Sequence, residues 1–311
     1  MGGSQMKKVL LIADRPGWAY DILAQYLVES LNDWQCEIAY IVNIRRKPRE
    51  FDVGDFDVVF FFLWYDAMRY GPDFKGFSFD KTCVGVHSHA SWLKRGISLQ
   101  QAKEICESFA ACGVISNLLE SELGIANCFL TPNGVNPNRF PLSQMPSTDL
   151  LKFMWVGNPS VSHHGDNKGF ESIIKPVFEE LEGVELLTAT PENPISHDEM
   201  GQFYSDGHVL ICMSMHEGGP LPVIEAMHCG RPVISTKVGI VPEIVEHGVN
   251  SWIVDRSRSA LTEAITNLVE NHSDIEKMGK KAHDAVVNRS ISDMANNYRT
   301  MFESVIIEKG V

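Results

Sequence analysis

The chain has 311 residues and a formal net charge of −13. That length suits two domains better than a single core. So large an acidic excess argues against a general nucleic-acid binder, because phosphate neutralisation needs an excess of Lys and Arg. The seven cysteines include no C-x-x-C pair, which favours buried thiols in a reducing cytoplasm. The longest strongly apolar run, residues 58–65, is too short to span a bilayer, so a cytoplasmic protein is expected.

The first half of the chain alternates between apolar runs and amphipathic segments. Continuous apolar runs such as "KKVLLIAD" (7–14) are typical of strands covered on both faces, as in a parallel sheet. The alternation predicts a doubly wound α/β domain. Strands are expected at 7–14, 36–42, 56–64, 82–88 and 113–117, and helices at 19–31, 98–112 and 117–123.

A segment rich in Pro, Asn and Ser, residues 129–151, is the predicted linker. The strand and helix alternation restarts after it, and three helices are expected at the end of the chain, over 257–272, 273–288 and 291–308. We therefore predict two Rossmann-like domains, each with a parallel sheet, facing a cleft. The predicted boundaries are 6–145 for an acceptor-side domain, 150–290 for a nucleotide-sugar donor domain, and 291–311 for a helix that crosses back to the first domain.

The stretch "SMHEGGPLPVIEAMHCGRPVIS" (214–235) places two carboxylates around a turn. The strand before it should end near Ser214, so the following loop lies at the carboxyl end of a parallel strand, where open α/β sheets bind ligands. Two prolines suit the first turn of the next helix, whose N-terminus favours an anion. Glu217 and Glu225 are good acceptors for sugar hydroxyls. Together these features suggest a sugar diphosphate as ligand.

The same stretch, with the following "VGIVPEIVEHGVNSWIV", closely resembles the donor-site signature of the retaining glycosyltransferase family 4 (glycosyl transferases group 1), which has a GT-B fold. The match covers E-x7-E and the later P-E-I-V-x-x-G over residues 214–254. "TPNGVNPNRF" (131–140) and "DNKGF" (166–170) also resemble family segments.

The resemblance implies roles for several residues. Glu217 would lie by the transferred sugar, on the face where the acceptor arrives, and Glu225 would accept hydrogen bonds from the ribose hydroxyls. The backbone around 186–194 would contact the nucleobase. Further contacts to the sugar or the diphosphate would come from the backbone of Gly218, Gly219 and Leu221.

Other implied contacts lie outside this stretch. Lys168 would neutralise the diphosphate, and Gly17 would let the backbone approach the same phosphate. His87, or else His89, would contact the sugar from the first domain. The family often has Arg where this chain has Asn158, and a neutral Asn cannot supply the bidentate phosphate contact of Arg.

Four other patterns have simpler interpretations. "SHHGD" (162–166) resembles a metal cluster, but adjacent histidines on a loop are weak support for one. "DFD" (55–57) is explained by the polar start of a strand, and no metal or other cofactor is expected. The aromatic residues Trp64, Tyr65 and Tyr70 follow a strand and could stack on a sugar acceptor. The basic cluster Arg45, Arg46, Lys47 and Arg49 is chiefly interpreted as a solvated loop, with weak peripheral contact to an anionic membrane as the alternative.

We therefore expect a retaining glycosyltransferase that moves a sugar from a nucleotide-diphosphate sugar to a hydroxyl acceptor, either a glycan, a lipid-linked molecule or a small molecule. Two alternatives stay open. One is a GT-B nucleotide-sugar epimerase or hydrolase, and the other is a non-catalytic relative that binds nucleotide or sugar.

Overall fold

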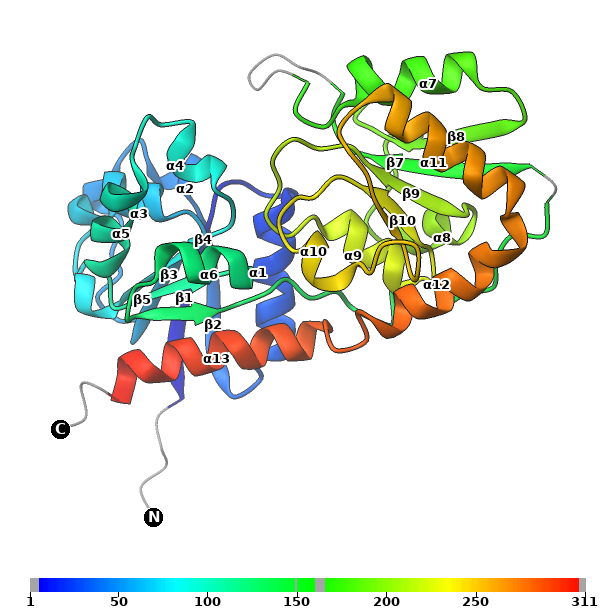
Figure 1. Cartoon of the computed structure of the whole chain (residues 1–311). Coiled ribbons are helices and arrows are strands. Elements are labelled where there is room, and N and C mark those ends of the chain that lie inside the picture. The colour runs from blue at the N-terminus through cyan, green and yellow to red at the C-terminus, as the bar shows by residue number, and fades with distance from the viewer. Residues whose placement is uncertain (1–5, 149, 160–165, 308–311) are drawn as a thin grey trace. The chain divides into compact units, whose positions relative to one another are not determined.

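The computed structural model describes residues 6–148, 150–159 and 166–307. The chain divides into two compact units (Figure 1). Unit 1 comprises residues 1–134 together with 291–311, and unit 2 comprises residues 135–290. Each unit is built on a parallel sheet flanked by helices, which confirms the predicted α/β class.

Unit 1 has a six-stranded sheet in the order β2-β1-β3-β4-β5-β6, with parallel neighbours throughout. Its strands are β1 (Lys7–Ala13), β2 (Trp34–Tyr40), β3 (Val58–Phe61), β4 (Thr82–Val86), β5 (Ala111–Val114) and β6 (Cys128–Leu130). Its helices are α1 (Ala19–Ser30), α2 (Ile41–Ile44), α3 (Trp64–Tyr70), α4 (Ala90–Leu93), α5 (Leu99–Glu107), α6 (Asn117–Leu123) and α13 (Ile291–Ile307). Every residue of β3, β4 and β5 is buried, as expected for strands covered on both faces.

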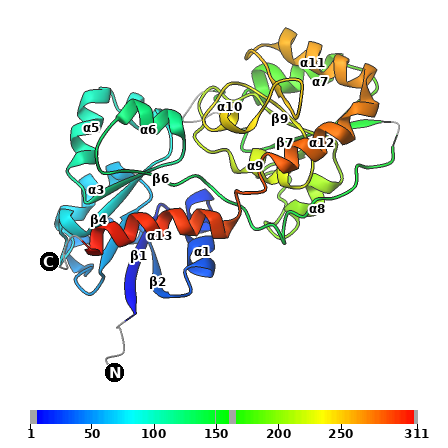
Figure 2. The same cartoon turned by 60° about the horizontal axis from the view of Figure 1, so that its bottom comes forward.

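The last helix, α13, is part of unit 1, and Figure 2 shows it running beside α1 along the sheet. Its aromatic face carries this packing. The Tyr298 ring meets Phe60 of β3 edge-on at 5.3 Å between centroids, and Phe302 lies 5.8 Å from Trp34. The chain therefore enters unit 2 at Val135 and returns to unit 1 at Ile291.

Unit 2 has a five-stranded sheet in the order β11-β10-β9-β7-β8, again with parallel neighbours. Its strands are β7 (Leu151–Val156), β8 (Val184–Ala189), β9 (Val209–Cys212), β10 (Val233–Ser235) and β11 (Trp252–Ile253). Its helices are a π-helical segment (Phe170–Ile174), α7 (Lys175–Glu180), α8 (Met200–Ser205), α9 (Leu221–His228), α10 (Val241–Ile244), α11 (Arg258–Glu270) and α12 (Ile275–Asp284). The π-helical segment ends two residues before Pro176, which has no backbone N–H to donate to a preceding carbonyl.

Several predicted boundaries differ from the structure. The helix expected over 98–112 ends at Glu107, and the strand expected at 113–117 is β5, four residues long. Ser116 instead caps α6, because its Oγ accepts the backbone N–H of Leu119 at 3.2 Å. The short edge strand β6 falls where a linker was expected to begin.

The units divide at residues 134 and 135 rather than near residue 145. The reason is a buried arginine in unit 2. The Arg231 side chain is fully buried and donates to the carbonyls of Ser143 and Gln144, which ties this part of the expected linker to the domain that follows it.

Candidate functional site

The carboxyl edge of the sheet in unit 2 carries the loop 213–220, which connects β9 to α9. Pro220 is the N-cap residue of α9 and Pro222 lies in its first turn. The Pro220 side chain makes no capping hydrogen bond, and Val223 N–H donates to the Pro220 carbonyl at 3.0 Å. Because Pro222 has no N–H, the Leu221 N–H is the first-turn donor that can bond to an external acceptor. The positive end of the helix dipole makes that acceptor an anion.

Glu217 lies beside this helix terminus and is held by two donors. Its Oε1 accepts hydrogen bonds from Lys168 Nζ at 2.9 Å and from Ser214 Oγ at 3.0 Å. Burial lowers the pKa of Lys168, but the Glu217 carboxylate more than compensates and the pKa is raised overall. Lys168 is therefore charged at neutral pH. The structure brings together two of the residues predicted from the sequence.

The segment that carries Lys168 is fixed to the loop of Glu217 by its backbone. Met215 N–H donates to the Asn167 carbonyl at 2.7 Å, and Asn167 Nδ2 donates to the His216 carbonyl at 3.1 Å. Gly169 adopts a φ of +71°, and a Cβ there would lie 2.7 Å from the Met213 carbonyl oxygen. The glycine is thus required by both the backbone conformation and the close approach of the two segments.

The glycines of the loop are held by a second segment. Ile240 N–H donates to the Gly218 carbonyl at 2.8 Å, and a Cβ on Gly239 would lie only 1.7 Å from that oxygen. Gly218 is buried, Gly219 is half-buried, and Leu221 begins α9. Asn158 lies exposed just after β7.

Glu225 lies one helical turn further along α9 and is almost completely buried. Its Oε2 accepts a hydrogen bond from the Tyr204 hydroxyl of α8 at 2.7 Å. Burial raises the pKa of Glu225 to about 7, although the hydrogen bond from Tyr204 acts in the opposite direction. The carboxyl group is therefore poised between its two protonation states near neutral pH, as is common for groups at functional sites.

Arg231 supports both of these elements. Its guanidinium group donates to the backbone carbonyls of Tyr204 and Ser205 at the end of α8, and of Cys229 at the end of α9. The same guanidinium group also donates to the carbonyl and hydroxyl oxygens of Ser143 and to the carbonyl of Gln144. The arginine of the "GRP" motif thus has a structural role that positions the helices of Glu225 and Tyr204.

The remaining predicted residues lie in unit 1. Gly17 has a φ of +75°, and its N–H donates to Asp21 Oδ2 at 2.7 Å. His87 follows β4, is buried and packs against Tyr20, with the two rings tilted by 54° and 4.8 Å between their centroids. Burial lowers the pKa of His87 to about 4, so its imidazole is neutral at physiological pH. His89 instead contacts Glu122, with 2.6 Å between Nε2 and Oε2.

Several other sequence interpretations are decided by the structure. Trp64 follows β3, as expected, but it is buried in the first turn of α3 and so cannot stack on an acceptor. In the basic cluster, Lys47 pairs with Glu50 and Arg49 with Asp73. Asp57 of "DFD" accepts the backbone N–H of Lys8. The histidines of "SHHGD" lie outside the described residues.

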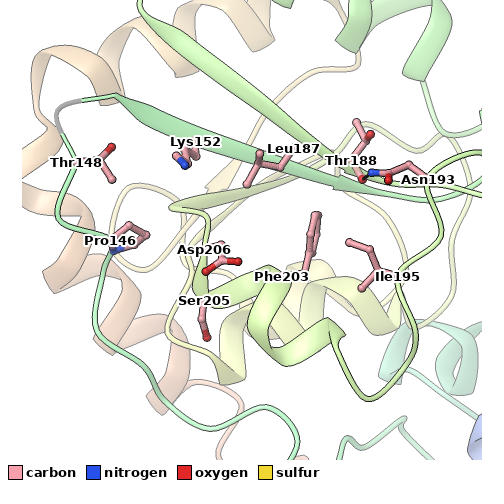
Figure 3. A pocket seen from close by; sticks show the side chains of 10 residues that line it. All are labelled: Pro146, Thr148, Lys152, Leu187, Thr188, Asn193, Ile195, Phe203, Ser205 and Asp206. Atoms are coloured by element: carbon pink, nitrogen blue, oxygen red, sulfur yellow. Dashed lines mark hydrogen bonds between the residues drawn. The ribbon is translucent and has the colours of Figure 1, made fainter.

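A cavity of about 550 Å³ lies in unit 2 beside the edge strand β8. Figure 3 shows Phe203 of α8 standing toward Leu187 of β8, with Ile195 next to it. Lys152 and Asp206 add charge to the lining. None of the predicted site side chains lines it, but three lining residues belong to the 186–194 segment: Leu187, Thr188 and Asn193.

Within the described ranges, no group of three His, Cys, Asp or Glu side chains is arranged to hold a metal ion. Likewise, no helix among those residues is both long and apolar enough to cross a bilayer.

Residues 192–285 match the family model described as "Glycosyl transferases group 1". Among solved structures, sucrose-phosphate synthase from Thermosynechococcus elongatus superposes with a TM-score of 0.77 over 97% of this chain and 100% of that one, at 15% identity. The chain has the GT-B fold, and its residues 192–285 are similar to the glycosyl transferases group 1 family. Anabaena HepE, solved in complex with UDP-glucose, is a further GT-B neighbour, with a TM-score of 0.65, 15% identity, and coverage of 96% of this chain and 99% of that one.

Curated relatives of this GT-B protein are similar over a smaller part of their length. N-acetyl-alpha-D-glucosaminyl L-malate synthase of Bacillus anthracis is 24% identical over 35% of this chain and 29% of its own. An uncharacterized glycosyltransferase of Methanocaldococcus jannaschii is 28% identical over 45% of this chain and 39% of its own. The chain thus spans well under half the length of these relatives.

Three residues of this GT-B site were not predicted from the sequence. Ser214 and Tyr204 bind the two glutamates, and Arg231 positions the helices around them. Tyr204 lies in "MGQFYSDG", where its spacing marks only the buried face of a helix, so no local signal separates it from a core residue. For Arg231 a signal existed, because an arginine between two apolar segments needs buried acceptors.

Proposed function

We propose that this protein is a retaining glycosyltransferase that moves a sugar from a nucleotide-diphosphate sugar to a hydroxyl acceptor without a divalent metal. The observation that carries the proposal is the Lys168–Glu217 pair beside the uncapped N-terminus of α9, with Glu225 one turn away. The family match over 192–285 and the structural neighbour that binds UDP-glucose support a nucleotide-sugar donor.

In this proposal the positive groups of unit 2 bind the donor's diphosphate. The α9 terminus and Lys168 stabilise the negative charge that develops on the leaving diphosphate, which is the electrostatic task that a metal performs in other enzymes. Glu225 accepts the ribose hydroxyls through its carboxylate. The 186–194 segment contacts the base, and the first-unit residues Gly17 and His87 contact the phosphate and the sugar, His87 as a neutral imidazole.

The chemical step breaks the bond between the anomeric carbon and the diphosphate oxygen and forms a bond from that carbon to the acceptor oxygen. The acceptor's hydroxyl proton passes to the departing phosphate oxygen on the same face of the sugar, so the anomeric configuration is retained. Glu217 lies on that face and stabilises the positive charge that develops on the sugar. The exposed cluster Arg45, Arg46, Lys47 and Arg49 makes a weak peripheral contact with an anionic membrane in this proposal.

The first test is a thermal-shift panel of nucleoside diphosphates and their sugars on the wild type and on Glu225→Ala. We expect a rise of several degrees in Tm with one nucleotide, and loss of that rise in the variant, because a ligand that binds only the folded state raises its stability. Donor turnover without an acceptor would favour a hydrolase. Tight binding without turnover across an acceptor screen would favour a binding protein, and no shift with any nucleotide would contradict the donor site itself.

A further inference from the structure

Three arginines lie at the carboxyl edge of the sheet in unit 1, and we call them the arginine cluster: Arg45, Arg69 and Arg95. Arg45 caps the end of α2, which directly follows β2, and Arg69 lies in the last turn of α3, which follows β3. Arg95 follows α4, after β4. These strands are parallel members of one sheet, so their carboxyl ends share the edge at which α/β sheets bind ligands.

The electrostatic field of all three arginines acts on one side chain, the half-buried Asp66 of α3. Even so, none of the three forms an ion pair within 4.0 Å with any carboxylate of the described residues; the arginines that do so are Arg49, Arg139, Arg289 and Arg299. The arginine cluster therefore acts electrostatically on Asp66 but is not neutralised by direct contact with a carboxylate of the described residues. Such an arrangement leaves guanidinium N–H groups for an external acceptor.

Arg95 is held in a defined position. Its guanidinium carbon lies 3.3 Å from the centroid of the Tyr65 ring, and its Nη1 donates to the Ser91 carbonyl at 2.8 Å. Ser91 is itself fixed, because its Oγ accepts a hydrogen bond from the buried Trp64 indole at 3.0 Å. Stacking occupies the face of a guanidinium group and leaves its edge donors available, and this geometry suits a phosphate.

Two carboxylates complete this edge of unit 1. Asp14 follows β1, and its Oδ1 is buried without a hydrogen-bond partner in the described structure. Burial raises the pKa of Asp14, and it raises the pKa of Asp66 to about 6. A buried carboxylate oxygen without a partner is costly, and a ligand hydroxyl would satisfy it. The edge thus offers acceptors for hydroxyl groups beside donors for an anion.

The ordinary interpretation of exposed arginines is solvation, and the same region supplies a comparison. Lys47 and Arg49, in the same basic stretch as Arg45, each pair with a nearby carboxylate. In a chain with a net charge of −13 such partners are plentiful. Three like charges at one sheet edge that do not form such pairs repel one another, and a bound anion would reduce that repulsion.

We propose that the arginine cluster binds the phosphate group of a polyol phosphate, while Asp14 and Asp66 accept its neighbouring hydroxyls. This inference rests on the proposed glycosyltransferase function and makes the polyol phosphate the sugar acceptor. The phosphate is carried either by a free polyol phosphate or by a lipid headgroup. Its recognition needs the same guanidinium donors in both cases.

The test uses the full chain and binding rather than turnover. sn-Glycerol 3-phosphate is titrated by calorimetry, with glycerol as the neutral probe, and co-sedimentation compares phosphatidylglycerol with phosphatidylcholine vesicles. The test variant is Arg69→Gln/Arg95→Gln. The matched control is Lys75→Gln/Lys94→Gln, which removes the same charge from exposed positions of unit 1. Arg95→Lys keeps the charge but loses the planar donors, and Tm is compared for every variant.

We expect the double arginine variant to weaken phosphate binding about 100-fold, since each lost charge-assisted contact is worth about tenfold. The control should bind within about twofold of the wild type, and Arg95→Lys should fall between. Arginine-dependent binding of glycerol 3-phosphate identifies a free acceptor, and arginine-dependent binding of phosphatidylglycerol vesicles alone identifies a lipid headgroup. Failure of the wild type to bind either probe, or equal losses in the test and control variants, would overturn the proposal.

The donor site is tested separately with Lys168→Ala. Phosphate bound at the donor's diphosphate position would be lost in that variant and kept in the arginine variants, and that pattern would also overturn the inference. Absence of nucleotide binding by the wild type, alongside arginine-dependent phosphate binding, would contradict only the proposed donor function.

Discussion

Replacing Glu225 with Gln should make the protein more stable at alkaline pH while it loses nucleotide binding. The folded protein buries this carboxyl group, and burial raises its pKa from the ordinary 4.5 to about 7. The difference corresponds to about 3 kcal/mol of folding free energy. Gln has nearly the same shape, carries no charge at any pH, and its amide oxygen can accept the hydrogen bond from Tyr204.

The direction of the pH dependence follows from proton binding. Below about pH 4.5 the carboxyl group is protonated in both the folded and unfolded states, and the wild type and Glu225→Gln should have similar stability. As the pH rises through 4.5 toward 7, the unfolded chain releases its proton first, so the wild type loses stability progressively. The variant should not lose it, and the gap between the two should approach about 3 kcal/mol above about pH 7.

The assay is denaturant unfolding at about pH 5 and about pH 8, together with nucleotide titration at about pH 8. Glu263→Gln, on the exposed face of α11, is the control, because an exposed carboxyl group gains little from neutralisation. A wild type that is as stable as Glu225→Gln at the higher pH would refute the argument from burial. A variant that keeps full nucleotide affinity would show that the carboxylate is not the ribose acceptor.

Three further predictions concern other parts of unit 2. Lys168→Ala should lower nucleoside diphosphate affinity by about tenfold or more, because a charge-assisted phosphate contact is lost. Calorimetry measures the affinity, and Lys175→Ala, at a half-exposed residue of α7, should leave it unchanged. Arg231→Met should lower the free energy of unfolding by about 3–5 kcal/mol, because the buried carbonyls that Arg231 bonds would lose their donor. If the loss is no larger than that caused by Arg258→Met at an exposed position, this role of Arg231 is wrong. Gly239→Ala should cost about 1–3 kcal/mol more than Gly183→Ala, because both have positive φ but only the former would clash with Gly218; equal Tm losses would show that the contact relaxes.

The sequence predicted the α/β class, the order of most elements and the segment that carries the candidate site of unit 2. Those features are local. Apolar runs identify β3, β4 and β9, and the two prolines mark the start of α9. Glu217 and Glu225 lie close together in the chain, so their association with this helix can be recognised from consecutive residues. The strand and helix patterns are set by neighbouring residues, so no tertiary information is needed to recognise them.

The sequence did not predict the protonation state of Glu225 or the side chains that bond to the two glutamates. Lys168 and Glu217 are 49 residues apart in the chain, and Tyr204 and Glu225 are 21 apart. Only the parallel sheet, which returns each strand to the same edge, places these atoms within 3 Å of each other. The pKa of Glu225 near 7 depends on the burial of one helix face against α8. The burial of Trp64 was not predicted for the same reason, since the residues that bury it come from several parts of unit 1. Charge, burial and proximity are properties of packing between distant segments, and for this protein only the tertiary structure decides them.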